Sequence, residues 1–182
     1  IAGTAAQGRI LLAAAISLAE IELLFADRIE SRDEIAFDDK TASLRGRRLR
    51  RLGALALADR PIKVTPDDDT ARMLAEGVAR LGIDRLPWTK SLRQWRDRVM
   101  FLRRAEGNEW PDLSDVALAA SNWLAPTFAG ITALAELSAD GLDEAVRGLI
   151  PWNQRRRLDT EAPTHFVAPS GSSVPIDYAA EE

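Results

Sequence analysis

The last quarter of the chain changes from helical to extended character at a single proline, and this order of elements constrains the fold more than any other feature. A short basic helix comes first, in which Trp152 and Leu158 supply an apolar side and three consecutive arginines supply a charged side. Pro163 ends this helix, because proline lacks the backbone N–H that a continuing helix needs. Two extended segments follow, separated by turn residues at 169–172. The sequence therefore predicts a basic helix and then a β-hairpin within residues 151–182.

Residues 64–150 show helical periodicity only. Thr65 is expected to cap a helix that begins at Pro66, because a threonine hydroxyl accepts a hydrogen bond from a first-turn amide and proline fits the first helical position. This helix is expected to end at Gly82, and a longer helix at 89–106 has apolar residues at helical spacing. Shorter helical elements are expected after it, at 114–124, 134–137 and 138–149.

Residues 1–63 are expected to form a β-rich module that contains one helix. Ser17 is the expected cap of this helix, which should run from about 18 to 26. Residues 11–15 also have high helix propensity, but Gly8 and Ser17 on either side favour a strand there. The predicted strands lie at 1–4, 9–16, 34–38 and 41–57, the last being one long or two short strands with bends at Gly46 and Gly53. The fold class is thus α+β, with a small antiparallel β module, a helical middle and a C-terminal β-hairpin.

Arginine supplies most of the positive charge, since 21 arginines and three lysines stand against 28 acidic residues, for a net charge of -4. The densest cluster lies in one predicted strand and comprises Arg45, Arg47, Arg48, Arg50 and Arg51. Because like charges so close together repel one another, anionic groups should lie nearby. Phosphates of single-stranded nucleic acid are one candidate. Carboxylates of a neighbouring strand are the other, and these would be Glu30, Asp33, Glu34 and Asp38.

A second group of arginines lies on the predicted helix at 89–106. Arg93, Arg96 and Arg103 share roughly one face of this helix and are further candidates for nucleic-acid binding. The alternative is a solvated charged face opposite an apolar stripe, which is the commoner arrangement on helices.

Aromatic side chains offer other candidates, because any nucleic-acid base can stack on them. Trp110 lies in a predicted loop and is expected to be the exposed tryptophan. His165 is the only histidine, so we expect a hydrogen-bonded structural role beside Asp177 or Tyr178 rather than catalysis or metal binding. The other four tryptophans are expected to pack in the core: Trp88, Trp95, Trp123 and Trp152.

Several kinds of site are excluded by what the sequence lacks. It has no cysteine, which excludes disulfides and cysteine-ligated zinc and fits a cytoplasmic protein. Its longest apolar run, at 10–16, is shorter than the about 20 residues that a membrane span needs. No Gly-Lys pair occurs, so the phosphate-binding loop of an ATPase is absent, and the acidic pair at 33–34 follows polar residues rather than the buried strand of a magnesium-binding box. We therefore expect no catalytic residue, metal or cofactor in this chain, and no membrane contact.

Four segments near the C-terminus resemble, in this order, the start of the family-specific C-terminal region of HrpB-type bacterial ATP-dependent helicases, which are relatives of the DEAH-box RNA helicases. They are PWNQRRRLD at 151–159, APTH at 162–165, PSGS at 169–172 and IDY at 176–178. Upstream segments resemble the same family in the same order, so the resemblance covers nearly the whole chain. These lie at 24–29, 45–55, 81–88 and 92–103.

The resemblance implies that the front β module completes or adjoins an oligonucleotide-binding-type barrel. Because the chain begins at Ile1 without a methionine, it is expected to be a fragment of a longer motor protein, with ATP and Mg²⁺ bound only in the missing motor domains. Its expected role is a non-catalytic accessory region that binds single-stranded RNA or DNA or couples it to the motor. A scaffold that docks on the motor domains or on another protein, without touching nucleic acid, is the alternative hypothesis.

Overall fold

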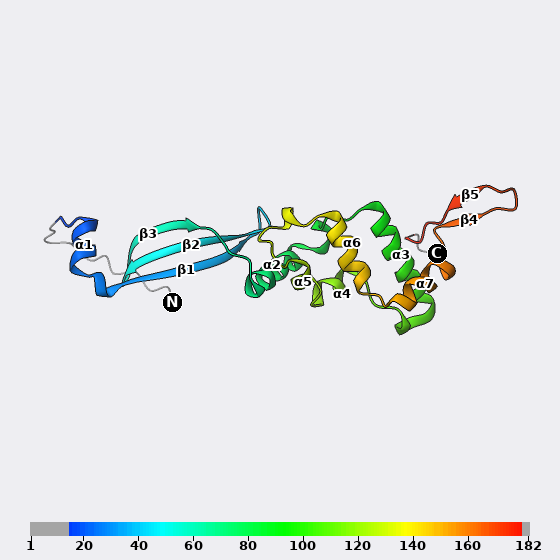
Figure 1. The fold of residues 1–182 in the computed structure, drawn as a ribbon, viewed down its shortest axis with the longest axis horizontal. Helices are drawn as coiled ribbons and strands as arrows, with labels where there is room; N and C mark the ends of the chain where they lie inside the picture. The colour runs from blue at the N-terminus through cyan, green and yellow to red at the C-terminus, as the bar shows by residue number, and fades with distance from the viewer. Residues whose placement is uncertain (1–14, 180–182) are drawn as a thin grey trace, which may run out of the picture. The chain divides into compact units, whose positions relative to one another are not determined.

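The computed structural model describes residues 15–179 (Figure 1). The strand expected at 1–4 and most of the strand expected at 9–16 lie outside the described residues. The chain divides into two compact units, one made of Ile1–Glu34 and Arg47–Ile62 and the other of Ile35–Gly46 and Lys63–Glu182. The α+β class is confirmed, whereas the three domains expected from the sequence stay a prediction.

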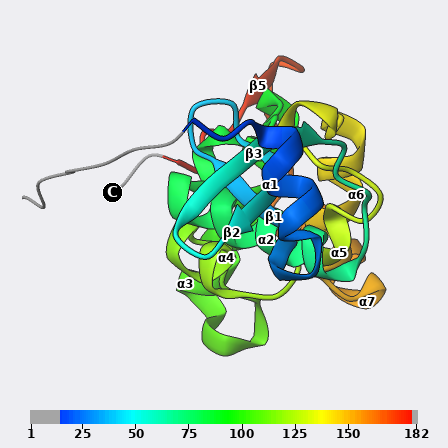
Figure 2. The same cartoon turned by 90° about the vertical axis from the view of Figure 1, so that its left-hand side faces the viewer.

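The first unit combines a short helix with most of a three-stranded sheet. Helix α1 (Leu18–Leu24) begins at Ser17 as expected, because the Ser17 hydroxyl accepts from the Glu20 amide while the Glu20 carboxylate accepts from the Ser17 amide. A 3₁₀ turn at Ala26–Arg28 leads into the sheet, whose strands follow chain order (Figures 1 and 2). They are β1 (Ile29–Asp38), β2 (Ser43–Leu52) and β3 (Leu55–Ile62).

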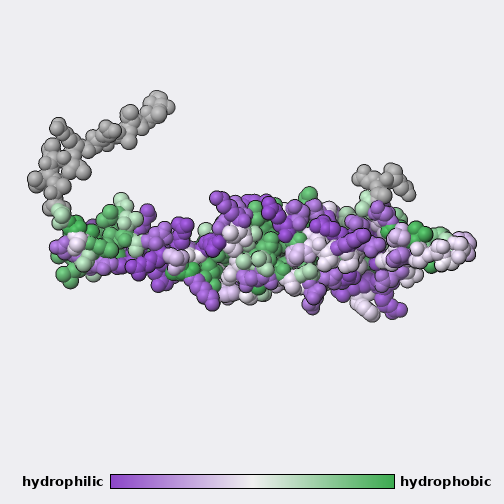
Figure 3. Space-filling view, turned by 90° about the horizontal axis from the view of Figure 1, so that it is seen from above, coloured by the Kyte–Doolittle hydropathy of each residue, from purple (hydrophilic) through white to green (hydrophobic). Residues whose placement is uncertain are grey.

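The strand expected at 41–57 is therefore two strands. Gly53 lies between them with φ 55°, a conformation that a glycine adopts without steric cost. The sheet is antiparallel and open among the described residues, so its membership in a barrel stays a prediction. None of the described side chains at 15–34 and 47–62 is buried, and hydrophobic surface is visible around α1 in Figure 3.

The second unit begins with the β1–β2 turn, which is anchored on the helical part. The Leu44 amide donates to the Thr132 carbonyl oxygen (2.8 Å), and the Leu134 amide donates to the Ala42 carbonyl oxygen (2.9 Å). The Phe37 ring packs directly on Gly77 in α2 (Asp68–Leu81). A side chain at this helical position would occupy the space of that ring.

Six α-helices, α2 to α7, and short 3₁₀ turns form the helical part of this unit among the described residues. The helix at 89–106 is confirmed as α3 (Lys90–Glu106), which begins at Thr89, stops at Gly107 and buries Leu92, Trp95, Val99 and Leu102. The remaining elements of this part are η2 (Ile83–Arg85), η3 (Gly107–Glu109), α4 (Asp115–Ala120), α5 (Leu124–Thr127), η4 (Leu134–Glu136), α6 (Ala139–Gly148) and α7 (Trp152–Glu161).

Two helix boundaries differ from the sequence-based expectation. The cap of α2 is Asp67 rather than Thr65, because the Asp67 carboxylate accepts from the Thr70 amide (2.7 Å) and the Thr70 hydroxyl accepts from the Asp67 amide (2.7 Å). The single helix expected at 114–124 is instead α4 followed by α5. Ser121 separates them with an extended backbone, and Pro126 lies inside the short α5.

The predicted C-terminal order of basic helix and hairpin is confirmed. Strand β4 (His165–Val167) pairs antiparallel with β5 (Ser173–Pro175), so that Phe166 faces Val174. The side chains of Phe166, Val167 and Val174 are more than half exposed. Figure 3 shows hydrophobic surface at the hairpin end. Beyond β5 the chain leaves the hairpin and runs along α3. No helix in the described part of the chain is long and apolar enough to cross a membrane.

Candidate nucleic-acid interface

The strand arginines predicted as phosphate contacts are mostly paired with carboxylates of the chain itself. In the second unit, Arg45 lies 3.5 Å from the Asp38 carboxylate at the other side of the β1–β2 turn. Because the Arg45 side chain is 59% exposed, this pair contributes little to stability.

Three arginines of the first unit are also paired with carboxylates. Arg48 donates two hydrogen bonds to the Asp33 carboxylate (2.6 and 2.7 Å), and this forked contact lowers the pKa of Asp33. Arg47 lies 3.3 Å from the Asp59 carboxylate, and Arg50 pairs with Glu22 of α1. Arg51 is exposed and has no ion pair within residues 15–179.

These pairs support the carboxylate interpretation of the cluster in part. Asp33 and Asp38 were expected as partners and are partners, whereas Glu34 pairs with Arg32. Asp59 and Glu22 were missed. Asp59 lies on β3, so only the order of the strands, and no local sequence signal, could have indicated it.

The arginines of α3 hold the loop that follows this helix. Arg96 donates to the Leu113 carbonyl oxygen (2.6 Å) and lies 2.7 Å from the Asp115 carboxylate. Arg103 donates to the Trp110 carbonyl oxygen (2.6 Å) and lies 3.6 Å from Asp112. Their side chains are 17% and 27% exposed, so these candidates are largely committed to the chain itself.

Trp110 is fully buried, contrary to the expectation that it is the exposed tryptophan. Its indole N–H donates to the Glu106 carboxylate (3.0 Å), and the Arg157 guanidinium lies 5.5 Å from the ring centroid. The core position expected for Trp152 is also wrong, since this side chain is 72% exposed. Trp95 and Trp123 are buried as expected, and Trp88 is half-buried.

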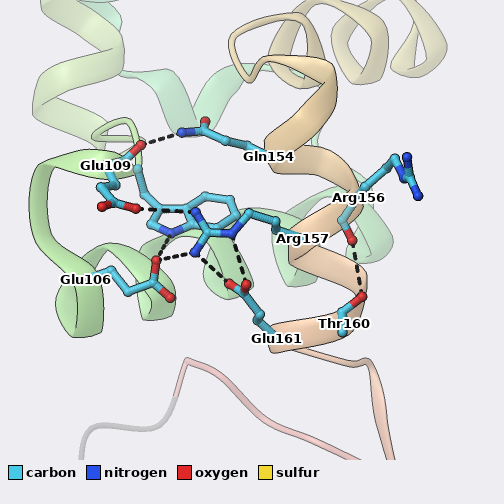
Figure 4. Close-up of polar contacts among 8 residues, drawn as sticks. Glu106, Glu109, Gln154, Arg156, Arg157, Thr160 and Glu161 are labelled. Carbon is cyan, nitrogen blue, oxygen red and sulfur yellow. Dashed lines mark hydrogen bonds and ion pairs between the residues drawn. The ribbon is translucent and has the colours of Figure 1, made fainter.

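Arg157 joins the loop after α3 to helix α7 through three carboxylates (Figure 4). Its guanidinium lies 2.9 Å from Glu161, 2.7 Å from Glu106 and 3.3 Å from Glu109. These bonds raise the pKa of Arg157, with Glu161 the largest cause. The pKa of Glu106 is lowered, first by the Trp110 indole and then by Arg157. Arg156, by contrast, points away from this cluster (Figure 4).

Arg98 was missed by the sequence analysis although its side chain is only 6% exposed. It donates to the carbonyl oxygens of Ala162 (2.5 Å) and Leu158 (3.0 Å), which are at the end of α7, and to the Asp159 carboxylate (2.8 Å). Its spacing from Leu92, Trp95 and Val99 places it beside the buried stripe of α3, which is a signal that the sequence does contain.

Arg93 is the one candidate of α3 without an ion pair within residues 15–179. It is exposed, lies 5.7 Å from the Trp88 ring centroid, and lines a hollow of about 440 Å³ together with Lys90 and His165. His165 is exposed, shares a hydrogen bond of 3.0 Å with the Thr164 hydroxyl and lines the hollow with Asp177 and Tyr178, whereas its expected structural role stays a prediction. Within residues 15–179, no group of histidine and acidic side chains could hold a metal ion.

Residues 123–182 match the family described as ATP-dependent helicase C-terminal (HrpB_C). The ATP-dependent RNA helicase HrpB of Escherichia coli strain K12 is 29% identical over 175 residues, which cover 94% of this chain. The chain is similar to the C-terminal region of HrpB-type helicases. It spans about a fifth of the length of the HrpB proteins that it matches (20–22%).

Two crystal structures extend this likeness from sequence to fold. The E. coli DExH-box NTPase HrpB matches with a TM-score of 0.57 and 28% identity, over 92% of this chain and 21% of that chain. The E. coli DEAH/RHA helicase HrpB matches with a TM-score of 0.58 and 30% identity, over 83% of this chain and 20% of that chain. The resemblance seen in the sequence segments is therefore confirmed, and the HrpB-type likeness includes the β strands as well as the helices.

Proposed function

We propose that this chain is a non-catalytic accessory region of an ATP-dependent helicase and that it contacts single-stranded nucleic acid in the cytoplasm. The observation that carries the proposal is the likeness to E. coli HrpB over 94% of the chain. The absence of a Gly-Lys pair supports a division of labour in which ATP and Mg²⁺ are bound by motor domains outside this chain.

The eight candidate arginines differ in whether a carboxylate of the chain already pairs with them. Six are ion-paired with carboxylates of the chain, so a phosphate would have to replace an existing partner. Arg51 in the first unit and Arg93 in the second have no such partner among the described residues. Cations without an intramolecular partner gain most from a phosphate, and we therefore assign the strongest phosphate contacts to these two residues.

Fluorescence anisotropy with labelled single-stranded RNA and DNA across a salt series tests the proposal. We expect binding that weakens with salt, and Arg51→Gln and Arg93→Gln should each lower the slope of log K against log salt by about one. Arg47→Gln is the matched control and should leave the slope nearly unchanged, because Arg47 already faces Asp59. Absence of binding by the folded wild-type chain at low salt would overturn the proposal.

A scaffold role is the second candidate, and the paired arginines favour it. Their guanidinium groups contact carboxylates and main-chain carbonyls, which are the groups that a protein partner also presents. The partner would be the motor domains of the helicase. Sedimentation velocity of this chain mixed with HrpB-type motor domains tests the role, and a folded Arg47→Glu and Arg48→Glu variant that still assembles would speak against the paired arginines as the contact.

A further inference from the structure

One hollow of the second unit combines cations with a partly buried carboxylate. Lys90, Arg93, Gln94 and Asp97 line it from α3, where spacings of three, four and seven residues bring side chains to one helix face. The opposite wall is residues 175–178, with His165 at the start of β4. Its volume of about 440 Å³ lies within the range of small-ligand pockets.

The wall opposite α3 is held in place by Tyr178. The Tyr178 hydroxyl donates to the Pro163 carbonyl oxygen (2.7 Å), and its ring meets Phe101 edge to face with the centroids 5.1 Å apart. Arg104 donates to the Tyr178 carbonyl oxygen (3.3 Å). Because Phe101 and Arg104 belong to α3, the two walls are tied to each other and the hollow is preformed.

The α3 wall carries both cations and a carboxylate that is unpaired among the described residues. Lys90 and Arg93 are exposed and have no ion pair within residues 15–179, so they are free to contact an anion. Asp97 is half-buried and has no hydrogen bond or ion pair in the same range. Burial raises the pKa of Asp97, and Asp177 adds to this, whereas Arg96, Arg93 and Arg104 oppose it. A partly buried carboxylate without a donor gains free energy when a ligand supplies N–H groups.

We propose that this hollow holds one nucleotide of a single strand, with its phosphate against Lys90 and Arg93 and the Watson–Crick edge of its base against Asp97. Guanine is the preferred base, because its N1–H and N2 amino group are adjacent donors that a carboxylate accepts as a pair. Uracil has one donor between two carbonyl oxygens, which the carboxylate repels. The site rests on the proposed function and deepens it by assigning a base preference to the nucleic-acid contact.

The test compares two labelled RNAs of about 12 nucleotides, one all uridine and one with a single central guanosine. We expect the folded wild-type chain to bind the guanosine RNA about tenfold more tightly, since a paired donor–acceptor contact discriminates by this order. Asp97→Asn should bring the two affinities together, whereas the matched control Asp140→Asn, an exposed aspartate of α6, should keep the preference.

The cations are tested separately from the base contact. The double variant Lys90→Gln with Arg93→Gln should weaken the binding of both RNAs equally and keep the base preference. The slope of log K against log salt should fall by about two. The double variant Lys63→Gln with Arg156→Gln removes two exposed charges outside the hollow and should retain the affinity of the wild-type chain for the guanosine RNA.

The outcomes separate this site from the broader proposal. Equal affinity of the wild-type chain for both RNAs, or a preference that survives in Asp97→Asn, overturns the guanine site while nucleic-acid binding stands. Binding of neither RNA overturns both. Guanosine monophosphate that competes as well as the strand would make a free nucleotide the ligand and overturn the single-strand assignment.

Discussion

At the scale of single residues, arginine acts here mainly as an internal donor. Arg98, Arg96, Arg103 and Arg155 each donate to a main-chain carbonyl oxygen at a helix end or in a loop. A guanidinium group has five N–H donors in a fixed plane, so it can satisfy such carbonyl groups while its charge meets a carboxylate. Lysine, with one compact ammonium group, would fit these contacts less well.

Arg98→Met tests the most buried of these contacts. Methionine fills similar space but leaves the Ala162 carbonyl oxygen without its donor, while the Leu158 carbonyl oxygen keeps only the Ala162 amide, so we expect the free energy of unfolding to fall by about 1–3 kcal/mol. Arg98→Lys should recover only part of it, because an ammonium group cannot reach three acceptors in one plane. Urea denaturation monitored by circular dichroism measures the free energy of unfolding of both variants.

The exposed Arg156 provides the control for this prediction. Arg156→Met should change the free energy of unfolding by no more than about 0.5 kcal/mol. An Arg98→Met variant as stable as Arg156→Met would show that the hydrogen bonds of the buried Arg98 guanidinium group do not stabilise α7.

Sequence reasoning found where the arginines of α3 are but not what they bind. The positions of Arg96 and Arg103 on one helix face follow from their spacing, yet their acceptors lie 17 and seven residues further along the chain. Such acceptors become neighbours only after the loop at 107–114 has folded back on α3. The hollow at Asp97 was missed for the same reason, since its second wall comes from residues 175–178.

At the scale of elements, the boundaries set by local backbone chemistry were predictable. Gly82 and Gly107 end α2 and α3 with φ of 111° and 76°, conformations that only glycine adopts readily. Boundaries for which two neighbouring residues could both serve as the cap were not predictable from the sequence. Thr65 and Asp67 are both good caps by residue type, and the reciprocal bond with Thr70 decides for Asp67.

The contact between β1 and α2 predicts the effect of a small change at Gly77. Alanine is normally the better helix residue by about 1 kcal/mol, but a Cβ here would overlap the Phe37 ring. The destabilisation from overpacking should exceed the gain in helix propensity, so we expect Gly77→Ala to lower the free energy of unfolding by about 1–3 kcal/mol. Thermal denaturation monitored by circular dichroism provides the measurement.

Gly148→Ala is the matched control in α6, where nothing lies within 4 Å of an added Cβ. It should leave the midpoint of unfolding unchanged or raise it slightly. A Gly77→Ala variant that behaves like Gly148→Ala would mean that Phe37 does not pack on α2 in solution. Combining Gly77→Ala with Phe37→Leu should restore part of the loss, because the smaller side chain frees the space.

At the scale of the whole molecule, the fold class and the order of the elements were predictable because each helix and strand carries its own periodicity. The division into units was not, because it cuts through β1 and β2, and a boundary inside a strand leaves no mark in composition or turn residues. The family likeness was also predictable, since its segments keep their order along the chain.

The two units differ in the number of side chains that they bury, and this difference predicts separate stabilities. None of the described side chains at 15–34 and 47–62 is buried, whereas α3 alone buries Leu92, Trp95, Val99 and Leu102. Because segments with few buried apolar contacts open at low free-energy cost, amides of β3 should exchange with deuterium much faster than those of α3. Hydrogen exchange with mass spectrometry of peptides covering 47–62 and 90–106 measures the two rates.

Leu49→Ala sharpens this test, because Leu49 is a half-buried side chain of β2 in the first unit. It should speed exchange in the 47–62 peptide and leave the 90–106 peptide unchanged, since a local opening does not draw on the core around α3. Equal protection in both peptides, or acceleration of both by Leu49→Ala, would show instead that the chain opens as one cooperative body. Independent opening would allow the β strands to adapt to a partner while the helical unit keeps the hollow beside Asp97 in place.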